Sequence, residues 1–196
     1  MLRQGETTTH VILLLEGCVK VTADTSEGQS VLLDVRIAGD LVGELAALDG
    51  APRLATVTAA GLVRVRMIDL ASFHGFVHRH PMAGLAVSAA VAAKLRWSTR
   101  RRIDFGAYPV PVRLARVILE LVRAYGRPDG EEVCIGVELS QPEWAALIGA
   151  SEPAVHRALK DLRRRGIVRT GYRQTVVVQP ASLAEMAETD RANTVM

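Results

Sequence analysis

Residues 43–57 carry side chains suited to an anionic ligand that also has hydroxyl groups. Gly43 precedes a short predicted helix, whose first backbone N–H groups can face an anionic oxygen. Glu44 can accept a hydrogen bond from a ribose hydroxyl, and Arg53 can bring its guanidinium group to a phosphate. From residue types alone, a solvated Glu–Arg pair beside a turn is the alternative. The segment is therefore a candidate nucleotide site.

A second group of candidate residues lies on two helices that follow closely on one another near the carboxyl end. Ser140 and Glu143 form a capping-box pattern before a helix predicted over 141–148, and Ser151 begins a second helix predicted to reach about residue 165. Strands at 167–170 and 175–179 can pair around residues 171–173. This order is typical of a winged helix-turn-helix.

The charge is distributed unevenly along the 196 residues. Residues 1–93 carry 7 basic and 9 acidic side chains, net −2, whereas residues 94–173 carry 16 and 9, net +7. A basic second half next to an acidic first half suggests two units, of which the second faces a polyanion. A solvated basic surface without a ligand is the alternative.

The remaining elements follow from hydrophobic patterning. Short strands are predicted at 10–15, 18–22, 31–37, 55–59 and 62–68, separated by Gly-containing turns, which indicates an antiparallel barrel or sandwich. After Pro81 a long helix carries residues at alternating steps of three and four, a pattern that suits either a parallel helix pair or the core of a monomer. Tyr108–Pro111 then breaks that helix and predicts a hinge, followed by a helix over 112–125 and a turn at 126–130.

Several classes are disfavoured by composition. Two cysteines are too few for a disulfide framework, an iron–sulfur cluster or a zinc finger, and no metal ligand set is predicted. The longest apolar stretches are far shorter than a membrane span, and no signal peptide is evident, so we expect a cytoplasmic protein without a membrane partner. No nucleophile–base arrangement or kinase loop is present, so we expect a protein that is not an enzyme.

Residues 43–57, with Gly-Glu-Leu-Ala followed by Pro-Arg-x-Ala-Thr-Val, resemble the phosphate-binding cassette of cyclic-nucleotide-binding domains. From residue 2 to about residue 180 the chain resembles the Crp/Fnr family of bacterial transcription regulators. The resemblance implies that Glu44 binds the ribose 2′-hydroxyl and Arg53 the cyclic phosphate. It also implies a homodimer through the long helix. The implied nucleotide-binding set is Gly43, Glu44, Leu45, Ala46, Arg53, Leu54, Ser98 and Thr99.

The same resemblance implies double-stranded DNA as a partner, with a palindromic operator, and RNA polymerase as a further partner. The exposed start of the second helix would enter the major groove, where Arg157 is the best candidate for a guanine contact. The implied base-contacting residues are Glu152, Pro153, His156 and Arg157. The phosphate-contacting candidates are Gln141, Ser151, Lys160, Thr170 and Arg173.

Two features depart from the family pattern. Leu54 follows the arginine where a smaller residue is usual, and the helix and first strand that normally precede residues 3–6 are missing. We therefore expect an α+β fold with an N-terminal antiparallel β-roll truncated at its start (1–80), a dimerisation helix (81–107), a winged helix-turn-helix (108–183) and a tail (184–196). The predicted effector is a cyclic nucleotide, with cAMP favoured. A regulator of the same fold with a different effector or none is the alternative, and an enzyme that acts on cyclic nucleotides is the least favoured hypothesis.

Overall fold

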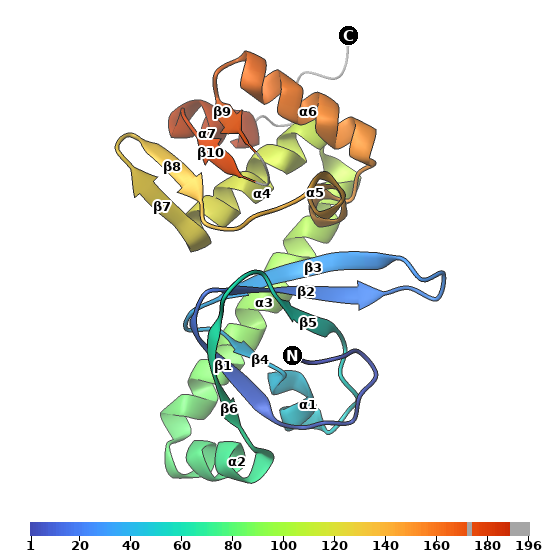
Figure 1. Cartoon of the computed structure of the whole chain (residues 1–196), viewed down its shortest axis with the longest axis vertical. Helices are drawn as coiled ribbons and strands as arrows, with labels where there is room; N and C mark the ends of the chain where they lie inside the picture. The colour runs from blue at the N-terminus through green and yellow to red at the C-terminus, as the bar shows by residue number, and fades with distance from the viewer. Residues whose placement is uncertain (172–173, 189–196) are drawn as a thin grey trace. The chain divides into compact units, whose positions relative to one another are not determined.

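The computed structural model describes residues 1–171 and 174–188, and these form two compact units that divide between Ser98 and Thr99. We refer to them as the N-terminal unit and the C-terminal unit and describe each by itself. Figure 1 labels the helices and strands of both. The long helix α3 (Pro81–Ala107) contains the boundary between the units.

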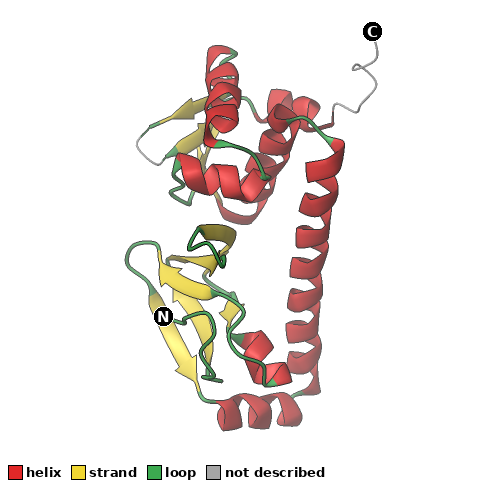
Figure 2. Ribbon diagram, turned by 90° about the vertical axis from the view of Figure 1, so that its right-hand side faces the viewer, coloured by secondary structure: helices red, strands yellow, loops and turns green. Residues whose placement is uncertain are grey.

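Antiparallel strands build the N-terminal unit (Figure 2). In residues 1–98, all of which the structure describes, one sheet has the order β4-β1-β6 and another the order β3-β2-β5. The strand bounds are β1 Val11–Glu16, β2 Cys18–Asp24, β3 Ser30–Ile37, β4 Leu41–Val42, β5 Thr56–Ala59 and β6 Arg64–Ile68. Residues that alternate along β1 and β2 face the space between the sheets, so apolar side chains from both sheets meet there.

The core of this unit has two clusters of buried side chains. The first joins the two sheets and consists of Leu2, Ile12, Leu14, Val19, Val42 and Val57. The second contains Val11, Ala47, Phe73 and Val87 and attaches three helices to β1. Those helices are α1 (Glu44–Asp49), α2 (Leu70–Arg79) and the first turns of α3. Burial of these apolar surfaces holds α1, which carries Glu44 of the cassette, against β1.

Much of the apolar surface of α3 is left uncovered within the chain. Val87 is the buried residue of this helix, whereas Leu85, Leu95 and Ile103 are each 60% exposed or more. Each unit also contains one cysteine, both half-buried: the Cys18 thiol contacts the Ala60 carbonyl, and Cys134 Sγ lies 3.5 Å from Gln174 Nε2.

In the C-terminal unit, helices pack on a small antiparallel sheet. The sheet order is β7-β8-β10-β9, and α7 packs on α4, as Figure 1 shows. The bounds are α4 Val110–Tyr125, β7 Gly126–Asp129, β8 Glu132–Ile135, α5 Gln141–Ile148, α6 Glu152–Arg164, β9 Val168–Thr170, β10 Thr175–Val177 and α7 Pro180–Glu188. Fully buried side chains from four helices, including Leu114, Ile118, Ile148, Leu162 and Leu183, form its core.

The predicted α+β architecture is confirmed, and five of the six N-terminal strands and both helices of the helix-turn-helix lie where the sequence indicated. The predicted turn at 126–130 is wrong in part: Gly126–Asp129 is strand β7, paired with β8 in an antiparallel hairpin. Helix α2 and the short strand β4 were not expected. Asp69 caps α2, its side chain accepting a hydrogen bond from the Ser72 N–H.

Candidate functional site

The cassette begins at Gly43, whose backbone needs a glycine for two separate reasons. Its φ of 85° lies in the left-handed region, and it caps the start of α1 between β4 and Glu44. A Cβ atom at Gly43 would also lie 2.5 Å from Arg53 Nη1 and 3.1 Å from the His10 carbonyl oxygen. The absence of a side chain therefore lets the Arg53 guanidinium approach the backbone where α1 begins.

Arg53 is almost fully enclosed, with 4% of its surface exposed. Its Nη1 donates to the Gly43 carbonyl at 2.7 Å, its Nη2 to the His10 carbonyl at 2.6 Å, and its Nε to Thr8 Oγ1 at 3.2 Å. Burial lowers the pKa of Arg53, and the nearby carboxylates of Glu6 and Glu44 oppose that shift. The structure thus brings Arg53, Glu44 and Gly43 together at the start of α1, and their binding of a nucleotide stays a prediction.

The main chain on either side of Arg53 is also fixed. The Arg53 N–H donates to the Glu6 carbonyl at 2.8 Å, and the Gly5 N–H donates to the Arg53 carbonyl at 2.8 Å. Of the five N–H groups of a guanidinium, three are engaged, which leaves one on each terminal nitrogen. These two N–H groups can donate to oxygens of a phosphate once the groups covering Arg53 move aside.

The other predicted nucleotide-binding residues differ in exposure. Ala46 is buried at 4%, Leu45 is 38% exposed, and Leu54 is 69% exposed. Ser98 and Thr99 both stand exposed on α3, at the boundary between the two units. Their place opposite the cassette stays a prediction.

The candidate DNA surface is the outer side of α6. Val155, Ala158, Leu159 and Leu162 are buried on one side of this helix. The opposite side is exposed and carries the predicted residues at helical spacing: Glu152, Pro153, His156, Arg157 and Lys160. We call these five residues the exposed face of α6. Such a projecting helix, carrying Arg157 and Lys160 with no ion pair among the described residues, fits a major groove.

The start of α6 is open to an incoming group. Ser151 occupies the N-cap position, but its hydroxyl makes no capping hydrogen bond, contrary to the predicted cap. Gln141, at the start of α5, lies with its Nε2 3.2 Å from Nδ1 of His156. The first turns of the two helices are therefore joined by a side-chain contact, and Ser151 lies between them in sequence.

The wing and the arginines at the carboxyl end of α6 complete the C-terminal candidates. The Thr170 hydroxyl accepts a hydrogen bond from Arg163 at 3.1 Å, and Arg164 and Arg165 pair with Asp161 rather than standing free. Arg173, a predicted phosphate contact, lies outside the described residues. In the described part of the chain, no three His, Cys, Asp or Glu side chains gather as a metal site, and no helix is long and apolar enough to cross a membrane.

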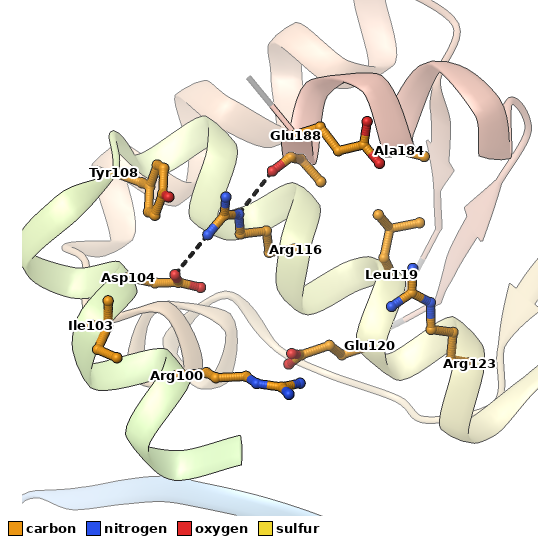
Figure 3. Close-up of a pocket in the computed structure, with 11 residues that line it drawn as sticks. Arg100, Ile103, Asp104, Tyr108, Arg116, Leu119, Glu120, Arg123, Ala184 and Glu188 are labelled. Carbon is orange, nitrogen blue, oxygen red and sulfur yellow. Dashed lines mark hydrogen bonds and ion pairs between the residues drawn. The ribbon is translucent and has the colours of Figure 1, made fainter. Parts of the chain in front are cut away.

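A cavity of about 280 Å³ lies elsewhere in the C-terminal unit, among the end of α3, α4 and α7 (Figure 3). Arg116 crosses it, donating to Asp104 Oδ1 and to the Ala187 carbonyl, both at 2.8 Å. The Arg116 guanidinium also stacks 3.7 Å from the centre of the Tyr108 ring. Three helices therefore converge on one arginine, a contact that the sequence did not indicate.

Comparison with known proteins identifies the family of this chain. Residues 1–80 match the cyclic nucleotide-binding domain, and residues 112–186 match the Crp-like helix-turn-helix domain. The chain belongs to the Crp/Fnr family. As a family member it is a DNA-binding transcription regulator with a cyclic-nucleotide-binding domain, and its relatives and fold are those of regulators rather than enzymes.

Two relatives illustrate the similarity within the Crp/Fnr family. The chain is 27% identical over 184 residues to the CRP-like cAMP-activated global transcriptional regulator of Mycobacterium tuberculosis (strain CDC 1551 / Oshkosh), covering 94% of this chain and 82% of that protein. It is 26% identical over 182 residues to the cAMP-activated global transcriptional regulator CRP of Escherichia coli O157:H7, covering 91% and 84%.

Solved structures agree in fold. A CRP/FNR-family transcriptional regulator from Thermus thermophilus superposes with a TM-score of 0.79 at 23% identity, covering 97% of this chain and 94% of that one. FixK2 from Bradyrhizobium japonicum superposes with a TM-score of 0.81 at 20% identity, covering 96% and 92%. These likenesses support the fold of the Crp/Fnr chain described above.

Sequence reasoning missed two partners of the cassette arginine, Thr8 and His10. A basic residue beside a predicted phosphate site was expected to face a ligand, and nothing in residues 8–10 indicates that they approach residue 53. The pairing of residues 5 and 6 with Arg53 depends on strand register, which a single sequence does not reveal.

Proposed function

We propose that the chain is a homodimer that binds a cyclic nucleotide, with cAMP favoured, and then a palindromic operator in double-stranded DNA. In this proposal residues 1–80 bind the effector, 81–107 pair the subunits and 108–183 bind DNA in the cytoplasm, where RNA polymerase is a further partner. The observation that supports it most directly is the convergence of Gly43, Glu44 and Arg53 at the start of α1.

Each cassette residue has a distinct part in the proposal. Glu44 accepts a hydrogen bond from the ribose 2′-hydroxyl, and the two unengaged N–H groups of Arg53 meet the cyclic phosphate. Leu45, Ala46 and Leu54 close the loop around the ligand, and Ser98 and Thr99 contact the base from α3. Relatives at 26–27% identity that are named cAMP-activated support cAMP as the effector.

The exposed side of α3 supports the homodimer. Leu85 is 62% and Leu95 67% exposed, so α3 carries more than one large apolar side chain that the chain itself leaves uncovered. Pairing of α3 with the same helix of a second copy would bury Leu95 and its neighbours. Two copies of α6 spaced about 34–36 Å apart would then match one turn of DNA. Replacement of Leu95 by Glu should convert the dimer into a monomer in sedimentation equilibrium.

The effector is tested by titrating a labelled duplex, selected by the wild-type chain from a random library, with and without cAMP. We expect cAMP to raise duplex affinity at least tenfold, because a ligand that prefers the DNA-competent state shifts the population toward it. Glu44→Gln should lose this response. Glu27→Gln, the same charge change at an exposed site in the same unit, should keep it. Equal affinity with and without cAMP contradicts cAMP control.

One observation favours a second candidate, a regulator of the same fold with another effector or none. Arg53 already donates to the Gly43 and His10 carbonyls, so the cassette is held together without a ligand. Calorimetry with cAMP and with cGMP separates the two candidates. Absence of heat with either nucleotide, together with tight binding to the selected duplex, supports the second.

A further inference from the structure

The carboxyl end of α5 is held by side chains from outside the helix-turn-helix. Arg113, on α4, donates from Nη1 to the carbonyls of Ile148 and Gly149, both at 2.9 Å. Arg101, on the last turns of α3, donates to the carbonyls of Leu147 and Ala146. The last carbonyls of a helix have no partner within it, and the helix dipole favours cations there. Two arginines therefore satisfy the end of α5.

Both of these arginines lie near one aromatic ring. The guanidinium of Arg101 lies 5.8 Å and that of Arg113 5.7 Å from the centre of the Phe105 ring. The ring rests against Gly149, the residue at which α5 ends, so closely that a Cβ there would lie 2.9 Å from a ring atom. Gly149 also has a φ of 59°, in the left-handed region. We call Arg101, Phe105 and Arg113 the α5 clamp.

The α5 clamp is partly shielded from water. Nε of Arg113 is buried without a hydrogen-bond partner in the described part of the chain, and burial lowers the pKa of Arg113 while Asp104 opposes that shift. Burial of a guanidinium with an unsatisfied N–H is unfavourable, so the contacts it does make must be specific to keep it there. The clamp therefore constrains the position of the α5 end more tightly than a solvated surface arginine would.

The position of the α5 end in turn sets the position of α6. Gly149, Ala150 and Ser151 are the residues between the two helices, and α6 begins at Glu152, the first residue of its exposed face. With so short a connection, a shift of the α5 end moves the start of α6 along the DNA groove. Loss of hydrogen-bond geometry to a base edge lowers discrimination between bases, whereas contacts to phosphates tolerate small shifts better.

We propose that Arg113, acting with Arg101 and Phe105, is a positioning residue for DNA recognition that sets the placement of α6 by holding the carboxyl end of α5. None of the three touches DNA in this proposal. The inference rests on the proposed DNA contacts of α6 and is independent of the effector. It assigns to the last turns of α3 a contact with the helix-turn-helix, in addition to their proposed pairing with a second copy.

The test measures specificity separately from affinity. The full-length wild-type chain and its variants are titrated, by fluorescence anisotropy, with the duplex that the wild type selects from a random library and with a scrambled duplex of equal length. The nucleotide condition is the one in which the wild type binds. Arg113→Met should lower the ratio of the two affinities about tenfold, because base contacts are weakened, and leave the dependence on salt unchanged. Arg113→Lys should restore part of the ratio.

The matched control is Arg123→Met, since Arg123 is an exposed arginine on the same helix α4 and loses the same charge. It should keep the wild-type ratio. An unchanged ratio in Arg113→Met, or an equal loss on both duplexes, overturns the inference. A wild-type chain that selects no duplex contradicts the proposed function and removes this inference with it.

A double-mutant cycle keeps the proposal testable if Arg113→Met does not fold. Gly149→Ala is strained by its positive φ in any background, but it meets the ring only when Phe105 is present. We expect Gly149→Ala to lower the affinity ratio more in the Phe105 background than in the Phe105→Ala background. Equal effects in both backgrounds would show that the ring does not position α6.

Discussion

Arg53 and Arg157 carry the proposed chemistry of the two units, and they lie in opposite surroundings. Arg53 is 4% exposed and donates three hydrogen bonds to its own chain, whereas Arg157 stands exposed on α6 with no ion pair among the described residues. The exposed face of α6 is thus accessible to a DNA groove without rearrangement of the chain. The cassette is closed on itself and must rearrange before an anion reaches Arg53.

Without a ligand, the two arginines differ in what they contribute to the stability of the protein. Removal of Arg53 leaves two carbonyls and a hydroxyl without their donor inside the protein, which costs stability. Removal of Arg157 leaves no buried group unpaired, so only DNA binding can suffer. Four sets of variants test this contrast between Arg53 and Arg157.

The largest effect is expected from Arg53→Ala. Loss of three hydrogen bonds in a buried site should lower the free energy of unfolding by about 3 kcal/mol. Thermal and denaturant unfolding measure it. Arg66→Ala, at an exposed arginine of the same unit on β6, is the control and should change stability by less than about 0.5 kcal/mol. If both variants are equally stable, the closed form of the cassette is wrong.

Arg157→Ala should reverse this pattern. We expect a loss of about 2 kcal/mol in binding to the selected duplex relative to a scrambled one, with an unchanged melting temperature. Arg164→Ala removes the same charge from the same helix, at a residue paired with Asp161, and should retain the discrimination. Arg157 has no part in base recognition if the two variants lose discrimination alike.

The two N-cap serines of the helix-turn-helix offer a smaller contrast. Ser140 donates its N–H and its hydroxyl to the Glu143 carboxylate, at 2.7 and 2.8 Å, so Ser140→Ala should lower the free energy of unfolding by about 1 kcal/mol. The Ser151 hydroxyl makes no capping bond, so Ser151→Ala should leave stability nearly unchanged and weaken binding to every duplex similarly. A stability loss in Ser151→Ala equal to that in Ser140→Ala would argue against a phosphate contact.

The smallest effects concern acidic pH, and one carboxylate in each unit provides them, Asp69 in the N-terminal unit and Glu132 in the C-terminal unit. Hydrogen bonds from the Ser72 N–H and hydroxyl lower the pKa of Asp69, and the Arg169 side chain lowers the pKa of Glu132. A folded-state pKa below the unfolded one stabilises the fold above the unfolded pKa, and this contribution is lost as pH falls through the folded pKa. In Asp69→Asn and in Glu132→Gln, the melting temperature should therefore fall less steeply as the pH is lowered than it does in the wild type. If the slope of melting temperature against pH is the same as in the wild type, the corresponding contact does not stabilise the fold.

The sequence was informative where local signals and tertiary structure agree. Ser140, Glu143 and Gly149 predicted the bounds of α5 correctly, because the capping box and the left-handed C-cap are local features. Gly126 and Pro128 favoured a turn, yet pairing with β8 makes the segment an outer strand, a position that tolerates proline. In this segment, hydrogen bonding to β8 outweighs the local preference for a turn.

The candidate site was predictable in its residue types but not in its orientation. Gly43, Glu44 and Arg53 were identified from spacing, whereas the inward turn of the Arg53 side chain depends on carbonyls contributed by residues 10 and 43. The same holds for the α5 clamp. Arg101 and Arg113 lie 45 and 35 residues from the carbonyls of Ala146 and Ile148, and no local pattern connects positions so far apart.

The distribution of the cysteines gives each unit its own chemical reporter. Both thiols are half-buried and engaged with neighbouring groups, so an alkylating reagent reaches each one chiefly when its surroundings open. Alkylation at Cys18 then follows breathing of the β2 region, and alkylation at Cys134 follows that of β8. Peptide mapping after timed exposure to the reagent would give both alkylation rates in one sample of the natural chain. It would also show whether a small molecule that slows alkylation in one unit leaves the rate in the other unchanged.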